Sequence, residues 1–188
     1  MLTLFSLLAG LWMSAMTIPL SPQDWYISSS ADTECSGESL SSDGGFTEWT
    51  RVSVPSTVLG GLCNSGAYDD IFFDDNLARI DRSPFAVPWW YCTSFSMDNF
   101  NPSKEELNLV FEGINYRADV WLNGTKIMSS DCTYGAFNVF SCDITEFVAE
   151  ENKLAVLVTP PETGEFYMGF VDWAPAPPDH NMGIHRPV

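Results

Sequence analysis

The strongest indication of fold in this sequence is the stretch Tyr116-Arg117-Ala118-Asp119-Val120-Trp121-Leu122-Asn123-Gly124-Thr125-Lys126-Ile127-Met128. In its first half the side chains alternate, which puts one set on each face of a strand. The first set is Tyr116, Ala118, Val120 and Leu122, and the second is Arg117, Asp119 and Trp121. Asn123-Gly124 favours a two-residue turn, so residues 125–128 are expected to return as the second strand of a hairpin.

Short strands recur along the rest of the chain. They are predicted at residues 48–54, 90–97, 107–111, 137–142 and 154–159, with turn residues between them. One short helix is predicted at residues 58–62, after the capping residues Ser56 and Thr57. Residues 28–45 are rich in Ser, Asp, Glu and Gly and are predicted to end a strand and continue as an exposed loop. Together these elements predict an all-β, antiparallel sandwich with one short helix.

The composition is that of one folded domain with an acidic surface. The 188 residues are 45% hydrophobic and 18% charged, which excludes a wholly disordered chain. Eight Lys and Arg against 25 Asp and Glu give a formal net charge of −17. A field of this sign repels phosphate backbones and anionic lipids, so neither nucleic acid nor a membrane is expected as a partner. Neutral and cationic ligands are tolerated, and the acidity also fits a simple role in keeping an extracellular protein soluble.

Residues 1–15 are predicted to be a signal peptide, because an apolar run too short to span a bilayer ends in small residues near Ala15. We therefore expect a secreted protein whose folded domain covers residues 24–188. The five cysteines lack metal-binding spacing, and with only two histidines they imply neither a metal nor an organic cofactor. In an oxidising compartment two pairs would form disulfides and leave one thiol free. Cys132 and Cys142 are the closest in sequence, but the spacing does not assign the pairs.

The segment 172–181 carries the chemical groups that a sugar site needs. Trp173 offers a flat apolar ring for the C–H face of a sugar, and Asp172 and Asp179 offer acceptors for its hydroxyl groups. The same composition also fits a Pro-rich surface loop whose Trp fills a gap in the core. From this segment alone both interpretations stay open.

Four blocks of sequence resemble, in their order, the N-terminal sugar-binding jelly-roll domain of family 2 glycoside hydrolases. The resemblance covers nearly everything after Trp25 and is strongest to exo-β-D-glucosaminidases, with β-mannosidases and endo-β-mannosidases as relatives. The blocks are Val54-Pro55-Ser56-Thr57-Val58-Leu59, Pro88-Trp89-Trp90-Tyr91, Phe111-Glu112-Gly113-Ile114-Asn115-Tyr116-Arg117-Ala118-Asp119-Val120-Trp121-Leu122-Asn123-Gly124, and Asn181-Met182-Gly183-Ile184-His185-Arg186-Pro187-Val188.

This resemblance implies a galactose-binding-like jelly roll that helps to form the subsite for a non-reducing sugar. In the β-mannosidase relatives, the loop that matches Asp172 and Trp173 supplies a carboxylate and an aromatic ring to this subsite. Both residues are therefore expected to bind substrate, a β-linked glucosaminide or mannoside. Asp179 and Asn181 are expected on the same rim.

Other residues allow a functional and a purely structural interpretation. Trp89 and Trp90 are adjacent in a predicted strand, so their side chains point to opposite faces and at most one of them faces the core. The other could lie at the edge of the sugar site, and Trp89 is the candidate. Asn123-Gly124-Thr125 is a glycosylation sequon at Asn123, although the turn needs Asn-Gly in any case. Arg117 and Asp119 are expected to pair with each other.

Two further features concern the fit to the family. The acidic loop 69–77 resembles the family's loop after the short helix, which implies a place for acidic and aromatic contacts. The structural alternative is a solvated loop with Phe72 or Phe73 turned inward. His185 occupies a position where the family usually has Trp, which puts the local packing in doubt.

The resemblance places catalysis outside these 188 residues. Family 2 enzymes hydrolyse glycosides with retention through two Glu residues about 5–5.5 Å apart. Both lie in a (β/α)₈ barrel that follows the jelly roll after an immunoglobulin-like domain. We therefore expect no catalytic residue in this chain, and a jelly roll truncated at its last strand whose partners are the downstream domains of the same protein.

Three hypotheses for the function follow. The first is the N-terminal part of a secreted, exo-acting family 2 hydrolase, in which this domain helps to line the sugar subsite. The second is a freestanding, non-catalytic carbohydrate-binding module, which requires affinity for chitosan or mannan oligosaccharides. The third is a truncated product without function, which would not unfold cooperatively.

Overall fold

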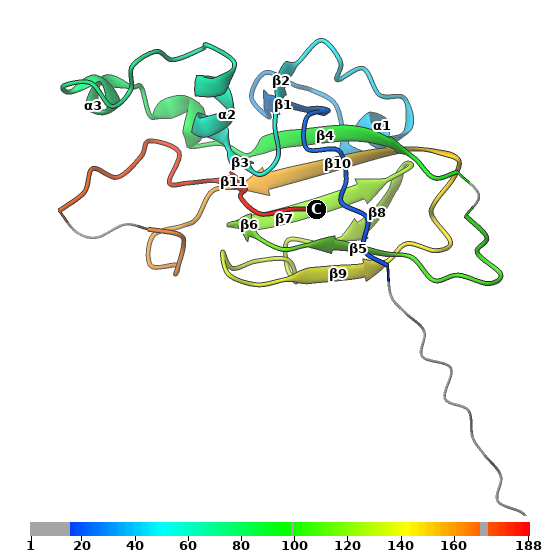
Figure 1. The fold of residues 1–188 in the computed structure, drawn as a ribbon. Coiled ribbons are helices and arrows are strands. Elements are labelled where there is room, and N and C mark those ends of the chain that lie inside the picture. Colours follow the sequence, from blue (N-terminus) through cyan, green and yellow to red (C-terminus); the bar gives the residue numbers. More distant parts are fainter. Residues whose placement is uncertain (1–15, 99, 170–172) are drawn as a thin grey trace, which may run out of the picture.

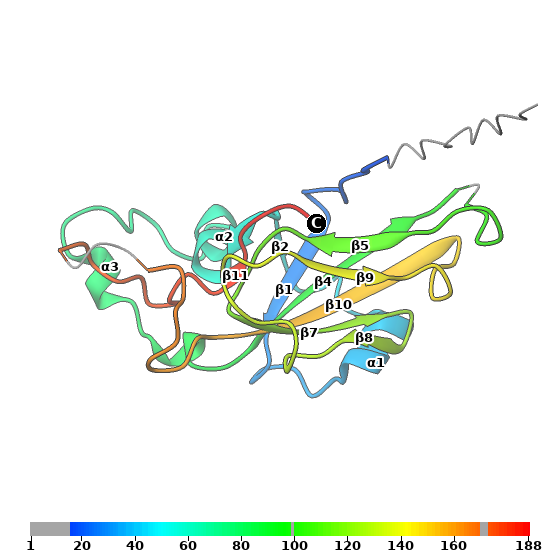
Figure 2. The ribbon, with the colours of Figure 1, turned by 90° about the horizontal axis from the view of Figure 1, so that it is seen from below.

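The structure is a computed structural model that describes residues 16–98, 100–169 and 173–188. Two layers of antiparallel strands face each other across an apolar core (Figures 1 and 2). The all-β sandwich expected from the alternating pattern is confirmed. The predicted signal peptide, residues 1–15, lies outside the described residues.

The larger layer is a six-stranded sheet in the order β2-β1-β4-β10-β7-β8, with every neighbouring pair antiparallel. Its strands are β1 (Trp25–Ser29), β2 (Thr50–Val52), β4 (Trp89–Ser96), β7 (Arg117–Leu122), β8 (Thr125–Met128) and β10 (Glu151–Thr159). The hairpin of β7 and β8 forms as predicted, with positive φ at both Asn123 and Gly124.

The smaller layer consists of two short sheets. One has the order β3-β11-β6 and the other pairs β5 with β9. The strands are β3 (Ser56–Thr57), β5 (Asn108–Phe111), β6 (Ile114–Asn115), β9 (Phe140–Asp143) and β11 (Gly183–Ile184). The last block of the sequence thus enters the second layer beside the first block, since Gly183 pairs with Thr57 on one side and with Asn115 on the other.

The core between the layers is built from the inward side chains of both. Trp25, Val120, Leu154, Phe111 and Ile184 are all buried there, the first three from the large sheet and the last two from the small ones. These side chains occupy every second position of their strands, as the sequence predicts.

The outer face of the large sheet is also buried, which the sequence analysis did not anticipate. Residues 37–42, predicted to be loop, form helix α1 (Gly37–Ser42), with Ser36 as its N-cap. This helix lies across the outer face over β7, β8 and β10 (Figure 2). Beneath it lies a second, smaller core made of Leu40, Phe46, Trp90, Cys92, Trp121 and Ala155. Trp90 and Trp121, whose rings are 5.5 Å apart, are therefore both buried on the outer face of the sheet.

Three further helical segments lie on the chain between β3 and β4. Helix α2 (Val58–Asn64) confirms the predicted helix, and Thr57 caps it through a hydrogen bond from the Gly60 N–H. Helix α3 (Asn76–Arg79) and the 3₁₀ helix Ser83–Phe85 were not predicted. Among the described residues, no helix is long and apolar enough to cross a membrane. The five cysteines are all free, so no disulfide is formed in this structure.

Helix α1 fits the sheet through one glycine. A methyl group added at Gly37 would lie 2.2 Å from the Trp121 ring, and that ring also donates a hydrogen bond to Glu38 in the same helix turn. The Trp121 ring cannot shift away from a new methyl group without disturbing its packing on Trp90.

We predict that Gly37→Ala lowers the free energy of unfolding by about 1–3 kcal/mol, since overpacking forces the helix off the sheet. Ser39→Ala is the matched control, because Ser39 is only half-buried and its hydroxyl donates a long hydrogen bond (3.4 Å) to the exposed Asp43, so its effect should stay within about 0.5 kcal/mol. Urea denaturation monitored by tryptophan fluorescence measures both. Equal stability of the two variants would contradict the packing described for α1.

Candidate functional site

The segments that carry the predicted site residues gather at one end of the sandwich. Helices α2 and α3 and the chain from residue 173 to β11 lie side by side there in both views (Figures 1 and 2). Of the expected site residues, Asp172 lies outside the described residues. The others occupy very different environments.

Asp179 is fully buried and holds the C-terminal loop against helix α2. One carboxylate oxygen accepts a hydrogen bond from the Leu59 N–H (2.8 Å), and the other accepts one from the Asn181 N–H (3.0 Å). Because Leu59 is in the first turn of α2, the carboxylate satisfies a backbone donor that has no partner within the helix. Burial raises the pKa of the Asp179 carboxyl above its ordinary value, against the opposing effect of the two N–H donors.

Asn115 and Asn181 tie the same loop to the second layer. The buried amide of Asn115 donates to the carbonyl oxygens of His180 and Asn181, at 2.9 and 2.8 Å. The Asn181 amide donates in turn to the Met168 carbonyl (2.7 Å). Both His180 and Asn181 have positive φ, so the chain turns sharply here and is held in that turn by buried amides. Asn115 was not predicted as a site residue.

Trp173 has the opposite character, because 83% of its surface is exposed. It therefore fills no gap in the core, and the second interpretation of its loop is not supported. Phe72 and Phe73, in the acidic loop that precedes α3, are also exposed, so the expectation that one of them turns inward is wrong. This end of the molecule thus presents apolar rings among carboxylates to the solvent.

Trp89 is buried, with 7% of its surface exposed. Its indole N–H donates to the Pro84 carbonyl (2.8 Å) and its ring stacks on Phe85 at 6.2 Å. The expectation that only one of Trp89 and Trp90 faces a core is wrong, because α1 covers the other face and both are buried. Through its contacts with Pro84 and Phe85, Trp89 packs against the 3₁₀ helix that follows α3.

Arg117 and Asp119 do not pair with each other, so that expectation is also wrong. Arg117 forms a two-pronged ion pair with Glu165, and Asp119 pairs with Lys126 at 2.6 Å. The hydrogen bonds from Arg117 lower the pKa of the Glu165 carboxyl. This ion pair fastens the segment after β10 to β7 at the same end of the sandwich, so Arg117 anchors the chain that leads into the site.

The amide of Asn123 is engaged within the fold. Its nitrogen donates to the Phe147 carbonyl and to the Asn152 side chain, and its oxygen accepts from the Lys153 N–H, all at 2.8–2.9 Å. A glycan at this nitrogen would replace one of the two donated hydrogen bonds. Glycosylation at Asn123 stays a prediction.

His185 is accommodated where the family usually has Trp. Its ring nitrogen Nε2 lies 2.8 Å from the Ala136 carbonyl oxygen, and its backbone N–H donates to the Gly113 carbonyl (3.1 Å). A side chain at Gly113 would lie 2.9 Å from the imidazole, so the pair of residues fits together without a gap. Among the described residues, no cluster of His, Cys, Asp and Glu is arranged to hold a metal ion.

The fold and these loops have counterparts in known proteins. Residues 25–165 match the family model described as the galactose-binding domain-like domain of glycosyl hydrolase 2. The chain therefore belongs to this family. It is 39% identical over 168 residues to an exo-β-D-glucosaminidase of Amycolatopsis orientalis, covering 87% of this chain and 16% of that enzyme.

Two other relatives extend the comparison. A mannosylglycoprotein endo-β-mannosidase of Lilium longiflorum is 32% identical over 148 residues, covering 73% of this chain and 15% of the relative. The solved complex of a variant of the Amycolatopsis orientalis exo-chitosanase CsxA with PNP-β-D-glucosamine matches with a TM-score of 0.79 and 37% identity, covering 90% of this chain and 20% of that one. The chain thus spans about a fifth or less of the length of these relatives.

We predict that Asp179→Asn lowers the free energy of unfolding by about 1–3 kcal/mol. The amide has one acceptor oxygen, so it leaves one of the N–H groups of Leu59 and Asn181 unsatisfied in a buried place. Chemical denaturation measures the effect, with Asp69→Asn, an exposed carboxylate in the neighbouring loop, as the control. An equal effect in both variants would remove the structural role assigned to Asp179.

The raised pKa of Asp179 also predicts a pH dependence. Its ordinary value is 3.8, and a higher value in the folded state means that the unfolded state loses this proton first as the pH rises. The contribution of Asp179 to stability should therefore decrease as the pH rises from 3.8 through the folded pKa. The free energy of unfolding is measured against pH for the parent and for Asp179→Asn, and the difference between the two curves isolates the contribution of Asp179. A stability difference that grows as the pH rises would contradict this prediction.

Proposed function

We propose that the chain is the N-terminal sugar-binding domain of a retaining family 2 glycoside hydrolase that acts on β-linked glucosaminides or mannosides. Membership of the family supports the sugar-binding role. The nature of the sugar is supported by the activities of the relatives, an exo-β-D-glucosaminidase and an endo-β-mannosidase.

The observation that carries the proposal is an exposed indole on an anchored loop. Trp173 projects into solvent, whereas a few residues later the same loop is fixed by the buried carboxylate of Asp179 and by the Asn115 amide. A ring with no packing role, held at a defined place, is suited to stack on the C–H face of a sugar. In this proposal Trp173 and Asp172 contact the sugar. Asn181, Asp179 and Trp89 do not reach the sugar and instead fix the position of the loop that carries Trp173.

The net charge supports an amino sugar as the substrate. A formal charge of −17 creates a field that attracts the protonated amine of a glucosamine unit and raises its concentration near the domain. The loop before α3, which carries the exposed Asp69, Asp70 and Asp74, lies at the same end of the sandwich as the chain from residue 173 to β11 (Figure 1). This attraction is screened by salt and does not depend on a specific contact.

In the proposal, hydrolysis itself belongs to further domains of the same protein. Retaining hydrolysis needs an acid/base carboxyl and a nucleophilic carboxylate about 5–5.5 Å apart across the bond that breaks. We propose that both lie in a barrel that packs on this end of the jelly roll, so that Asp172 and Trp173 complete its pocket. The 188-residue chain alone should not turn over a glycoside.

Secretion is part of the same proposal and is supported by the apolar run in residues 1–15. The mature protein should begin close to Ala15. N-terminal sequencing of protein recovered from the medium tests this, and a secreted product that retains Met1 would contradict it.

A chimera tests the proposed function directly. Residues 25–188 of this chain replace the matching segment of the Amycolatopsis orientalis exo-β-D-glucosaminidase, and hydrolysis of p-nitrophenyl β-D-glucosaminide is followed. The chimera should be active, and Trp173→Ala should raise KM by roughly 2- to 13-fold because a stacked ring contributes about 0.5–1.5 kcal/mol. Trp173→Phe, which keeps a flat ring, is the matched control. A folded chimera without activity, or equal KM values for all three proteins, would refute the proposal.

Calorimetry separates this function from a freestanding binding module. For a domain that forms only one wall of a pocket, titration of the isolated chain with chitosan tetrasaccharide should give a Kd of about 1 mM or weaker. Micromolar affinity lost in Trp173→Ala would instead establish an independent module. Cooperative thermal unfolding of the same sample excludes a chain that has no stable fold.

A further inference from the structure

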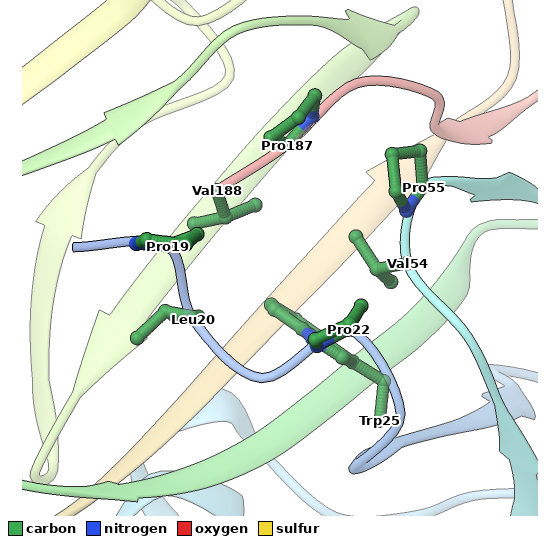
Figure 3. Close-up of a pocket in the computed structure, with 8 residues that line it drawn as sticks. All are labelled: Pro19, Leu20, Pro22, Trp25, Val54, Pro55, Pro187 and Val188. Carbon is green, nitrogen blue, oxygen red and sulfur yellow. The ribbon is translucent and has the colours of Figure 1, made fainter. Parts of the chain in front are cut away.

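Two recesses in the surface differ in their chemistry. One is an apolar groove of about 170 Å³, lined by Leu20, Trp25, Val54 and Val188 together with four prolines (Figure 3). The other has a volume of about 470 Å³ and lies where residues 41–42 of α1 meet residues 151–153 of β10. This second recess, here called the polar groove, is lined by hydroxyl, amide and charged side chains and by one aromatic ring. Its volume lies within the range of about 300–1,000 Å³ that is usual for ligand sites.

The floor of the polar groove is the outer face of the large sheet. Ser94 lies opposite Lys153 in the neighbouring strand, and Glu151 lies two residues before Lys153. They share the face of Cys92 and Ala155, which belong to the smaller core beneath α1, because side chains two residues apart in a strand point the same way. Strands β4 and β10 are each paired on both sides, so their edges are already filled. An added peptide strand therefore does not fit here, and side chains must recognise the occupant.

The walls of the polar groove are fixed by hydrogen bonds. The hydroxyl of Ser41 accepts from the Gly124 N–H (2.9 Å) and donates to the Gly37 carbonyl (2.7 Å), which joins α1 to the turn after β7. The buried amide of Asn152 accepts from the Ala149 N–H and donates to the Ala149 carbonyl, both at 2.8 Å. Because these contacts exist without a ligand, the groove is formed in advance, and little ordering of the protein opposes binding.

Two charged groups in the groove have hydrogen-bonding capacity to spare. The Lys153 ammonium donates to the Ser42 carbonyl (2.7 Å), which leaves two of its three N–H donors for a ligand. One carboxylate oxygen of Glu151 accepts from the Ser96 hydroxyl (2.8 Å), and the other has no partner among the described residues. A ligand can therefore find both donors and acceptors side by side.

This combination suits an uncharged sugar unit. A sugar hydroxyl both donates and accepts, so neighbouring hydroxyls can bind the Glu151 carboxylate and the Lys153 ammonium together. Phe147, which is partly exposed on the wall of the groove, offers an apolar ring for the C–H face of the sugar. The charges of Glu151 and Lys153 balance each other, so the groove gives a cationic or anionic ligand no local advantage.

We propose that the polar groove is a second saccharide-binding site of this domain, which holds an uncharged sugar unit. It lies at the start of β10, whereas the segment that leads to Trp173 follows the end of the same strand (Figure 1). The nine residues of β10 span about 27 Å, so the groove is separate from the proposed subsite and does not depend on it. If one polysaccharide chain engages both, the second contact benefits from the high effective concentration of a tethered ligand.

The test is a titration of the ¹⁵N-labelled chain with N-acetylchitotetraose, followed by amide NMR. The Ala149 and Lys153 amides should shift and saturate with a Kd of about 1–10 mM, because few groups contact one sugar unit. Phe147→Ala should raise this Kd by roughly threefold or more, since the stacking ring is lost. Glu151→Gln should do the same, because hydrogen bonds to a charged carboxylate are stronger than those to a neutral amide. Glu151 is exposed, so this variant should remain folded.

Phe166→Ala is the matched control, because it removes another exposed phenylalanine from the segment that follows the end of β10. This variant and Trp173→Ala should leave the shifts at the groove unchanged. The inference is overturned if the groove amides do not shift, if Phe147→Ala and Glu151→Gln keep the parent Kd, or if glycerol at equal mass produces the same shifts. Shifts confined to residues 173–181 that vanish in Trp173→Ala would overturn it too, while supporting the proposed subsite. An inactive chimera would refute the proposed function without affecting the groove.

Discussion

The buried carboxylate of Asp179 is the interaction on which the functional end of this domain depends. It joins the first turn of α2 to the loop that precedes β11, and so connects segments about 120 residues apart in sequence. A charge in an apolar place is stable only when donors surround it, and here two backbone N–H groups do so. Because Val58 also donates to the Met182 carbonyl, the helix start and the last strand are fixed to each other, and the exposed Trp173 projects from a defined base.

This arrangement divides the site residues into two kinds. Asp179, Asn115 and Arg117 are engaged with the chain itself, whereas Trp173 contacts little and is open to solvent. A wall that contributes to a pocket needs both, because a ring that stacks on a sugar is useful only when its position is set in advance. The family membership and the proposed function agree with that division.

Much of the fold could be predicted because strands with one buried face alternate visibly, as in Arg117–Leu122 and Asn108–Phe111. Helix α1 could not, since four of its six residues are Gly or Ser, which are poor helix formers, and it is stabilised by packing on Trp121. For the site, the sequence identified Asp179 but not its burial, which depends on a partner helix far away in the chain. Asn115 and the Arg117–Glu165 pair were missed because nothing local marks a contact across two layers.

The second small core beneath α1 has a consequence for how the strands find their alignment. In a sheet with one wet face, a slip of one residue exposes apolar side chains and is rejected for that reason. Strand β4 is buried on both faces from Trp89 to Thr93, so hydrophobicity alone barely distinguishes the two alignments. Shape has to distinguish them instead. The Trp121 indole lies where a side chain of residue 37 would be, so an alignment of β7 that moved this ring away from Gly37 would lose the fit between α1 and the sheet.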